Sequence, residues 1–311
     1  MYSPAYSALS AIGNTPFVQL RNIVPPQCAD IFLKLEYLNP TGSYKDRMAQ
    51  AIIEEAEQRG TLRPGMTVVE CTAGSTGTAL AFVCAVKGYR FRVISSDAFA
   101  KEKLQSMRAL GADIQLVPSE GGRITPDLIP RMIGVASELA QHPENYWTHQ
   151  FENRDAIEGY RKMGREILQQ CPAGVNVFLA AVGTAGMLSG VSLELKQVSP
   201  GTQVIALEPA ESPLLTQGVK GNHSIDGVGV GFIPPLLSAE TYDEVRAVPE
   251  AQARETARLL AAREGIFAGT STGLNVAAAL YLGCQLGPGY TVVTVACDSG
   301  MKYLAGGLFD Y

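Results

Sequence analysis

The sequence has few residues of the kinds that build metal sites and disulfide frameworks. Its 311 residues include only three histidines, which show no ligand spacing, and six cysteines, which form no close pairs. Most of the cysteines lie within apolar runs, and this favours reduced, buried thiols in a cytoplasmic protein over a disulfide framework. A zinc site or a histidine-driven catalytic triad is therefore not expected. The cysteines are Cys28, Cys71, Cys84, Cys171, Cys284 and Cys297.

The chain also lacks an excess of one charge and a long hydrophobic run. It has 25 Lys and Arg against 30 Asp and Glu, a formal net charge of -5, so its composition is not basic enough to suggest nucleic acid or an anionic membrane as a partner. No apolar run approaches the ~20 residues that span a bilayer. The first residues lack the charged and apolar regions of a signal peptide. We therefore expect a cytoplasmic protein with neither a nucleic acid nor a membrane as partner.

Strand-like and helical runs alternate along most of the chain. Strands are predicted at residues 31–36, 67–71, 91–95, 114–117, 175–180, 204–208 and 291–296, and helices at 45–59, 78–87, 101–110, 187–196 and 250–264, with another after 273. This order predicts an α/β fold with parallel sheets and helices on both faces. Residues 118–130, rich in glycine and proline, are predicted to form a loop that is able to move.

The length of the chain predicts two domains. We place the division near residues 147–153, between two series of alternating strands and helices. Residues 37–150 are expected to form a smaller N-terminal domain. Residues 1–36 and 151–311 are expected to form a larger C-terminal domain, and each domain should contain a mainly parallel, twisted sheet flanked by helices.

A lysine stands at the start of the first predicted helix. The segment Asn39-Pro-Thr-Gly-Ser-Tyr-Lys-Asp-Arg47 joins a strand to that helix and places Lys45 in its first turn, with Ser43 as a candidate N-cap. The amide dipoles at a helix start disfavour an ammonium, and a neutral amine condenses readily with an aldehyde. A solvated surface lysine is the alternative that this segment leaves open.

Two glycine-containing loops share one pattern, in which a strand is followed by small polar residues and then by a helix. They are Thr72-Ala-Gly-Ser-Thr-Gly77 and Gly183-Thr-Ala-Gly186. Amides at such a helix start bind anions, although a turn needing glycine only for its backbone gives the same pattern. An amino acid joined to pyridoxal phosphate presents two anions, a carboxylate and a phosphate. Thr270-Ser-Thr-Gly273 adds hydroxyls at another helix start, where a simple N-cap is the alternative.

Taken together, these segments resemble the cysteine synthase and cystathionine beta-synthase family of pyridoxal-phosphate enzymes over most of the chain. The segments that carry the resemblance are Ile12-Gly-Asn-Thr-Pro16, Asn39 to Arg47, Thr72 to Gly77, Gln150-Phe151, Val182-Gly-Thr-Ala-Gly186, Gly227-Val-Gly229, Gly231-Phe-Ile-Pro234, Gly269-Thr-Ser-Thr-Gly273 and Asp298-Ser-Gly300. The resemblance implies fold type II, similar to the tryptophan synthase beta subunit, with the cofactor in a cleft between the two domains. It also implies a homodimer.

The resemblance assigns a role to each candidate site residue. Lys45 would be the catalytic residue and would hold pyridoxal 5'-phosphate as an internal aldimine, and Ser271 would face the pyridine nitrogen. The other cofactor-binding residues would be Ser75, Gly183, Thr184, Ala185, Gly186 and Met187. The substrate-binding residues would be Thr72, Ala73, Thr76, Gln150 and Gly227. No residue is expected to bind a metal.

The implied activity is β-replacement on an activated L-serine derivative, which would make the protein a transferase of cysteine biosynthesis. O-acetylserine would lose acetate through an α-aminoacrylate, and sulfide would add to give cysteine. A neutral hydroxyl at the pyridine nitrogen favours loss of the β-substituent, and Lys45, once released, is the natural base for the α-proton. The alternative is β-elimination by a lyase, either a cysteine desulfhydrase or a serine/threonine dehydratase.

The sequence departs from the family pattern at three site positions. The family usually has asparagine where Ser75 stands, and its phosphate loop usually reads Gly-Thr-Gly-Gly-Thr, with glycine and threonine where Ala185 and Met187 stand. Two other classes of protein stay open. Gly183 to Gly190 with Glu208 weakly matches the loop and acidic residue of an NAD-binding oxidoreductase. The second class is a catalytically silent relative of the family that binds a partner.

Overall fold

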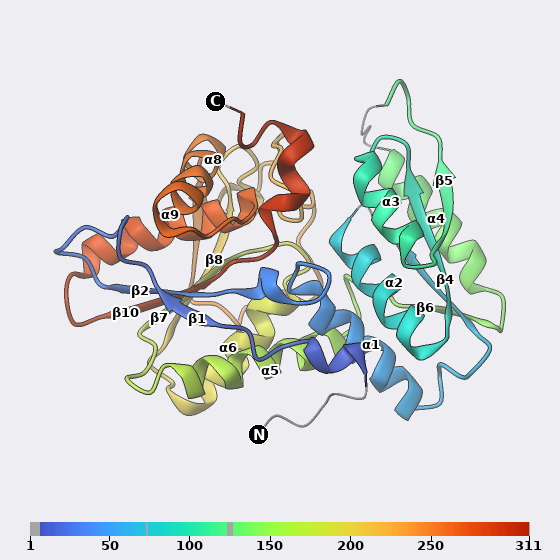
Figure 1. The fold of residues 1–311 in the computed structure, drawn as a ribbon, viewed down its shortest axis with the longest axis horizontal. Coiled ribbons are helices and arrows are strands. Elements are labelled where there is room, and N and C mark those ends of the chain that lie inside the picture. Colours follow the sequence, from blue (N-terminus) through green and yellow to red (C-terminus); the bar gives the residue numbers. More distant parts are fainter. Residues whose placement is uncertain (1–6, 73, 123–126, 311) are drawn as a thin grey trace. The chain divides into compact units, whose positions relative to one another are not determined.

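The computed structural model describes residues 7–72, 74–122 and 127–310, and the chain divides into two compact units. The first unit comprises residues 1–12 and 45–159, and the second comprises residues 13–44 and 160–311. Each unit contains one mainly parallel sheet flanked by helices, which confirms the predicted α/β fold (Figure 1). The domain limits expected at residues 37 and 150 stay a prediction. Within the described ranges, no helix is long and apolar enough to cross a membrane.

The first unit contains a parallel four-stranded sheet in the order β5-β4-β3-β6. Its strands are β3 (Thr67–Cys71), β4 (Arg90–Ser96), β5 (Asp113–Val117) and β6 (Asn145–Trp147), and its helices are α1 (Lys45–Gln58), α2 (Ser75–Lys87), α3 (Lys101–Ala109) and α4 (Leu128–Ala140), with a short 3-10 turn at Ala8–Ala11. Val68 and Val93 pack with α1, α2 and α3, whereas their neighbours Val69 and Ile94 pack with α4. Both faces of the sheet are covered, so successive side chains of its central strands are buried whichever face they point to.

Helix α4 begins inside the segment that the sequence predicts to be a loop. It runs from Leu128 to Ala140, and Pro130 is its third residue. A proline is tolerated there because the first amides of a helix have no acceptor within the helix. The loop prediction is therefore wrong from residue 128 onward, and residues 123–126 lie outside the described part of the chain.

The second unit contains a six-stranded sheet in the order β1-β2-β10-β7-β8-β9, in which only the β1–β2 pair is antiparallel. The strands are β1 (Phe17–Gln19), β2 (Asp30–Lys34), β7 (Val177–Ala181), β8 (Gln203–Pro209), β9 (Glu244–Val248) and β10 (Thr291–Val295). The helices are α6 (Gly186–Val198), α7 (Leu214–Gln217), α8 (Glu250–Leu259) and α9 (Thr270–Leu286). Helices α8 and α9 lie on one side of this sheet and α6 lies on the other (Figure 1).

The remaining helical segments extend or connect these elements. Helix α5 (Asp155–Gln170) contains the limit between the two units, and a π-helical turn, Leu260–Glu264, continues α8. Two 3-10 segments, Glu36–Leu38 and Gly300–Gly306, belong to the second unit. In both sheets the candidate loops follow the carboxyl ends of parallel strands, where ligands of open α/β sheets bind.

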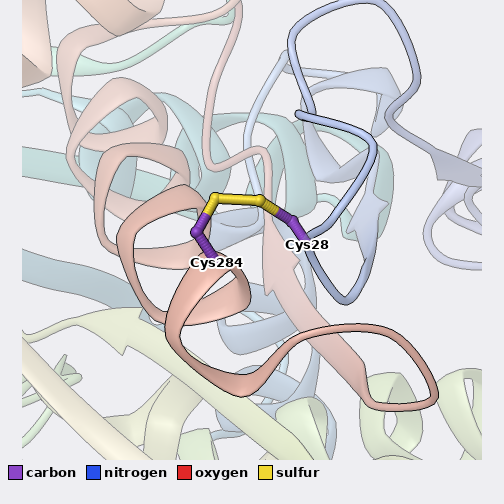
Figure 2. Close-up of a disulfide and its surroundings, with 2 residues drawn as sticks. All are labelled: Cys28 and Cys284. Atoms are coloured by element: carbon purple, nitrogen blue, oxygen red, sulfur yellow. A yellow bond between two sulfur atoms is a disulfide. The ribbon is translucent and has the colours of Figure 1, made fainter.

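A disulfide joins two distant parts of the second unit. Cys28 lies just before β2 and Cys284 lies in α9, 256 positions later (Figure 2). The expectation of reduced cysteines is therefore wrong for this pair, because their pairing depends on the fold and not on their spacing. The other four cysteines are buried thiols, and they are Cys71, Cys84, Cys171 and Cys297.

Reduction of this disulfide is expected to lower the free energy of unfolding by about 2 to 4 kcal/mol. The reason is that the cross-link closes a long loop and so restricts the unfolded chain. Chemical denaturation of the oxidised protein with and without dithiothreitol measures the change. The double variant Cys28→Ser/Cys284→Ser is the control, since reductant should leave its unfolding unchanged. Equal unfolding free energies for oxidised and reduced wild type would contradict the prediction.

Candidate functional site

Lys45 is the first residue of α1 and is only 7% exposed. The alternative of a solvated surface lysine is therefore wrong. Loss of water and the positive end of the helix dipole both disfavour an ammonium at this position. Asp46, in the same first turn, is also buried. A buried amine at the start of a helix is suited to covalent attachment or to proton transfer.

The residue before Lys45 is firmly held within the second unit. Tyr44 donates its backbone N–H to the carbonyl of Cys297 at 3.1 Å, and its ring packs on Tyr160 with centroids 5.6 Å apart. Burial raises the pKa of Tyr44 well above its usual value. Cys297 in turn donates its N–H to the hydroxyl oxygen of Thr272 at 2.9 Å. The backbone therefore has a fixed position at the residue that precedes Lys45.

The first glycine-containing loop connects β3 to α2. Thr72 is buried and donates its N–H to Ile94 in the neighbouring strand at 3.0 Å. Ser75 is the first residue of α2, and the N-cap residue Gly74 offers no side chain to the helix amides. Amides at such a helix start are available to an anion. Ala73, a predicted substrate-binding residue, lies outside the described residues.

The structure brings Thr76 and Gln150 together across 74 positions of sequence. The Thr76 hydroxyl donates to Gln150 Oε1 at 2.8 Å, and Gln150 Nε2 donates to the carbonyl of Cys71 at 2.8 Å. The Cys71 carbonyl only accepts, so the second bond fixes which end of the carboxamide carries nitrogen and which carries oxygen. Thr76 and Gln150 are both buried. The pair therefore forms a rigid polar corner beside the Thr72 loop.

Glu70 organises this corner, and the sequence analysis did not identify it. Its side chain is buried, and four donors converge on its carboxylate. They are the Thr148 hydroxyl at 2.5 Å, the Cys71 amide at 2.7 Å, the Gln150 amide at 3.0 Å and the Trp147 indole at 3.4 Å. Burial raises the pKa of Glu70, and these hydrogen bonds oppose that change. A charged residue inside the apolar run of β3 was the available signal.

The second glycine-containing loop begins α6 in the second unit. Ala185 is the N-cap of α6 and has a left-handed backbone with φ 67°, and no side chain caps the helix. Thr184 and Met187 are buried beside it. A left-handed residue directly before a helix start makes successive N–H groups converge, which forms an anion-binding concavity. The donors of residues 183–187 therefore fit a phosphate group.

Gly183 is required by its neighbour in space. A Cβ atom at Gly183 would lie 2.1 Å from the carbonyl oxygen of Gly227, so only glycine fits there. Gly227, the predicted substrate-binding residue, therefore lies directly on this loop. A hollow of about 300 Å³, counting its open mouth, borders the same place, and Gly183, Leu214 and Phe232 are among its lining residues.

Ser271 occupies the second position of α9 and is buried. The alternative that these hydroxyls simply cap the helix is wrong, because the N-cap is Gly269 and no side chain accepts an N-cap bond. Asn275, which the sequence analysis did not single out, ties this helix to two strands. Its Oδ1 accepts from the Ala181 amide at 2.8 Å, and its Nδ2 donates to the carbonyl of Val295 at 2.9 Å.

The acidic residue of the dinucleotide alternative is already used within the second unit. Glu208 is 3% exposed, and its carboxylate accepts the amide of Leu215 at 2.6 Å and the amide and hydroxyl of Thr216 at 2.9 and 2.6 Å. A ribose-binding carboxylate must present its oxygens to the ligand. Glu208 instead anchors the start of α7, and the geometry gives no support to an NAD site.

Comparison with known proteins identifies the family of this chain. The sequence profile of the family described as pyridoxal-phosphate dependent enzyme matches residues 8–298. A cysteine synthase of Staphylococcus aureus (strain N315) is 41% identical over 310 residues, which cover 99% of this chain and 98% of that protein.

Two solved structures are also similar. An O-ureido-L-serine synthase has a TM-score of 0.91 and 36% identity, covering 99% of this chain and 96% of the other. O-acetyl serine sulfhydrylase isoform 3 from Entamoeba histolytica has a TM-score of 0.92 and 33% identity, covering 100% of this chain and 94% of the other. The chain therefore belongs to the family of pyridoxal-phosphate dependent enzymes.

Proposed function

We propose that this enzyme is an O-acetylserine sulfhydrylase, which replaces the acetate of O-acetyl-L-serine with sulfide to give L-cysteine. The observation that carries the proposal is the 41% identity to a named cysteine synthase over 99% of the chain. The helix-start amides of α2 and α6 support it, because an amino acid and a phosphorylated cofactor each bring an anion.

We assign cofactor binding to Lys45, Ser75, Ser271 and residues 183–187. When bound, pyridoxal phosphate supplies an electron sink that lets the substrate lose its α-proton and then its β-substituent. Lys45 holds the cofactor through its amine. The amides of Gly183, Thr184, Ala185, Gly186 and Met187 hold the phosphate. Ser271 would face the pyridine nitrogen, where a neutral hydroxyl would not stabilise a protonated ring as a carboxylate does. Ser75 would contact the ring oxygen.

We assign substrate binding to Thr72, Ala73, Thr76, Gln150 and Gly227, and proton transfer to Lys45. The amides of the Thr72–Thr76 loop, with Thr72, Ala73 and Thr76, hold the substrate carboxylate. Gln150 donates the second hydrogen of its carboxamide nitrogen to the same carboxylate, since the first is bonded to Cys71. Lys45, at the start of α1, would accept the substrate's α-proton at its Nζ. The Glu70 network keeps this corner fixed before substrate arrives.

The identity of the second substrate, the nucleophile that replaces acetate, is the most specific part of the proposal. A similar structure carries the name O-ureido-L-serine synthase, so related chains differ in the group that they add. Elimination without replacement is the other outcome, in which serine or cysteine gives pyruvate. The two outcomes differ in whether water is kept out until the nucleophile arrives.

The proposal predicts that the purified protein, loaded with cofactor, forms cysteine from O-acetylserine and sulfide. Cysteine formation should require both substrates and should follow sulfide concentration to saturation. A colorimetric cysteine assay measures it, with protein lacking cofactor as the control. Faster formation of pyruvate from serine or cysteine alone would favour a lyase and contradict the proposal.

We further propose that the enzyme is a cytoplasmic homodimer acting on small amino-acid substrates. Resemblance to the family supports the dimer. The four buried free thiols support the compartment, and the Cys28–Cys284 disulfide opposes it. Disulfides are uncommon in reducing compartments, so the Cys28–Cys284 pair is a direct check. Alkylation of thiols at the moment of lysis, followed by mass spectrometry, reports its state in the cell, and sedimentation reports the dimer.

A further inference from the structure

The Gly227–Gly231 segment contacts the second glycine-containing loop, residues 183–187, which we call the phosphate loop. The segment has no regular structure of its own. Gly227, Gly229 and Gly231 have left-handed φ values of 79°, 58° and 81°. The N–H of Gly229 donates to the carbonyl of Val182 at 3.0 Å, directly before Gly183. The segment belongs to no helix or strand. Val228 is buried in the hydrophobic core of the second unit, and Gly229 beside it, which has no side chain to pack, is positioned by hydrogen bonds from neighbouring segments.

His223 supplies such a contact. Its Nδ1 lies 3.2 Å from the amide of Ile225, and its Nε2 lies 3.1 Å from the carbonyl oxygen of Gly229. A backbone N–H only donates, so Nδ1 is an acceptor and carries no proton. The hydrogen of the neutral ring is then on Nε2, which donates to Gly229. A Cβ at Gly229 would lie 2.5 Å from Nε2, so the ring packs directly on this glycine.

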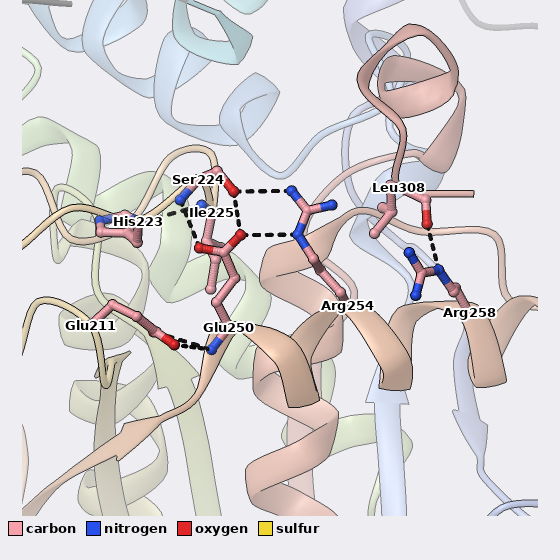
Figure 3. A network of polar contacts seen from close by, with 8 residues as sticks. All are labelled: Glu211, His223, Ser224, Ile225, Glu250, Arg254, Arg258 and Leu308. Carbon is pink, nitrogen blue, oxygen red and sulfur yellow. Dashed lines mark hydrogen bonds and ion pairs between the residues drawn. The ribbon is translucent and has the colours of Figure 1, made fainter. Parts of the chain in front are cut away.

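The turn that carries His223 is itself fixed to α8. The amide of Ser224 donates to Glu250 at 2.8 Å, and the Ser224 hydroxyl donates to the same carboxylate (Figure 3). Arg254 donates to Glu250 and to the Ser224 hydroxyl, both at 2.9 Å. The Glu250 amide donates to Glu211 at 2.9 Å. Burial opposes ionisation of Glu250, but the Ser224 and Arg254 contacts outweigh it and lower its pKa to about 2.

We propose that His223 is a positioning residue of the active site: its Nε2–H bond to Gly229 holds the Gly227–Gly231 segment against the phosphate loop. The inference rests on the proposed function, because it assigns that segment to the cofactor and substrate site. A chain of hydrogen bonds makes this connection. Glu250 of α8 holds Ser224, the neighbouring His223 ring holds Gly229, and Gly229 holds Val182, which precedes Gly183. The imidazole touches no reacting atom in this account.

Two conservative substitutions separate the two nitrogens of the ring. His223→Gln places an N–H donor near the position of Nε2 and so retains the bond to Gly229. His223→Asn retains an acceptor for the Ile225 amide, as in an Asx-turn, but is too short to reach Gly229. His223→Ala retains neither. His142 offers a matched control. Its Nδ1 accepts the amide two residues later, that of Glu144, at 3.3 Å, as His223 does with Ile225, but His142 lies in the first unit.

The test measures the cofactor-loaded variants in two ways that do not depend on turnover. Deuterium uptake of residues 223–231 and the rate of pyridoxal phosphate release should both rise roughly 3- to 10-fold in His223→Asn and His223→Ala, the range expected for one hydrogen bond. His223→Gln and His142→Ala should stay close to wild type. KM for O-acetylserine should rise in the same two variants.

Wild-type behaviour of His223→Asn would overturn the inference, and so would equal losses in all three His223 variants that follow their unfolding midpoints. Failure of the proposed function is a separate result. It would appear as wild-type protein that binds pyridoxal phosphate but forms no cysteine, and the exchange and release measurements would still decide the role of His223.

Discussion

Lys45→Ala is expected to abolish covalent attachment of pyridoxal phosphate and to lower kcat roughly 100- to 10,000-fold. The variant loses the amine that holds the cofactor and also the base that takes the α-proton. The small residue should fit at the first position of α1, because alanine is a strong helix former and that amide needs no acceptor within the helix. The effect should therefore be on chemistry and not on folding.

Borohydride reduction followed by mass spectrometry is the measurement for Lys45. Wild-type protein should gain the mass of one reduced cofactor on the peptide that contains Lys45, and Lys45→Ala should gain none. Lys101 is a matched control, since it is also the first residue of a helix but is exposed. Lys101→Ala should keep both the attachment and the activity. Attachment to another lysine in wild type would contradict the assignment.

Gly183→Ala is expected to weaken cofactor binding and lower kcat/KM about 100-fold, the size of effect that small misplacements in an active site produce. The added methyl group would lie 2.1 Å from the carbonyl oxygen of Gly227. Neither partner of this contact is a flexible side chain, so the phosphate loop or the Gly227 segment has to move. Both belong to the site that we propose.

Gly201→Ala is the control for Gly183→Ala. Gly201 is in the same unit, and a Cβ there would meet no atom within 4 Å. Titration of the two variants with pyridoxal phosphate gives the dissociation constants. Cofactor affinity should be lost only in Gly183→Ala, and unfolding midpoints should show that both proteins are folded. Equal affinity in the two variants would show that residues 183–187 do not hold the phosphate.

Local pattern was enough to predict the central elements of the fold. Strand β3 matches the predicted residues 67–71, because four of its five residues are buried and the run is apolar and β-branched. Helix α1 begins at Lys45 as predicted and ends two residues before Gly60. These segments carry their own signals of period and termination.

Elements with weaker local signals were missed. Helix α4 has a proline at its third position, and the glycine- and proline-rich residues before it favoured a loop prediction. Strand β9 is at the edge of its sheet, and only Val248 among its residues is buried. A short, partly exposed strand has little apolar periodicity, so pairing with β8 decides its structure.

The site was predicted only in part, because some of its residues have a local signal in the sequence and others do not. Lys45 and the two glycine-containing loops each have a signal within a few residues of sequence. The contacts that fix these residues have no such local signal. Glu70 accepts hydrogen bonds from β6 and the loop after it, and His223 reaches Gly229 only because the turn between them folds. The Cys28–Cys284 disulfide is the extreme case, since nothing in the spacing of the cysteines identifies the pair.

The most direct test of the account is the ratio of cysteine to pyruvate formed from O-acetylserine as sulfide is raised. We predict that cysteine exceeds pyruvate at every saturating sulfide concentration and that pyruvate formation falls as sulfide increases. A ratio that stays below one, with pyruvate formed at the same rate with and without sulfide, would contradict β-replacement as the function of this enzyme.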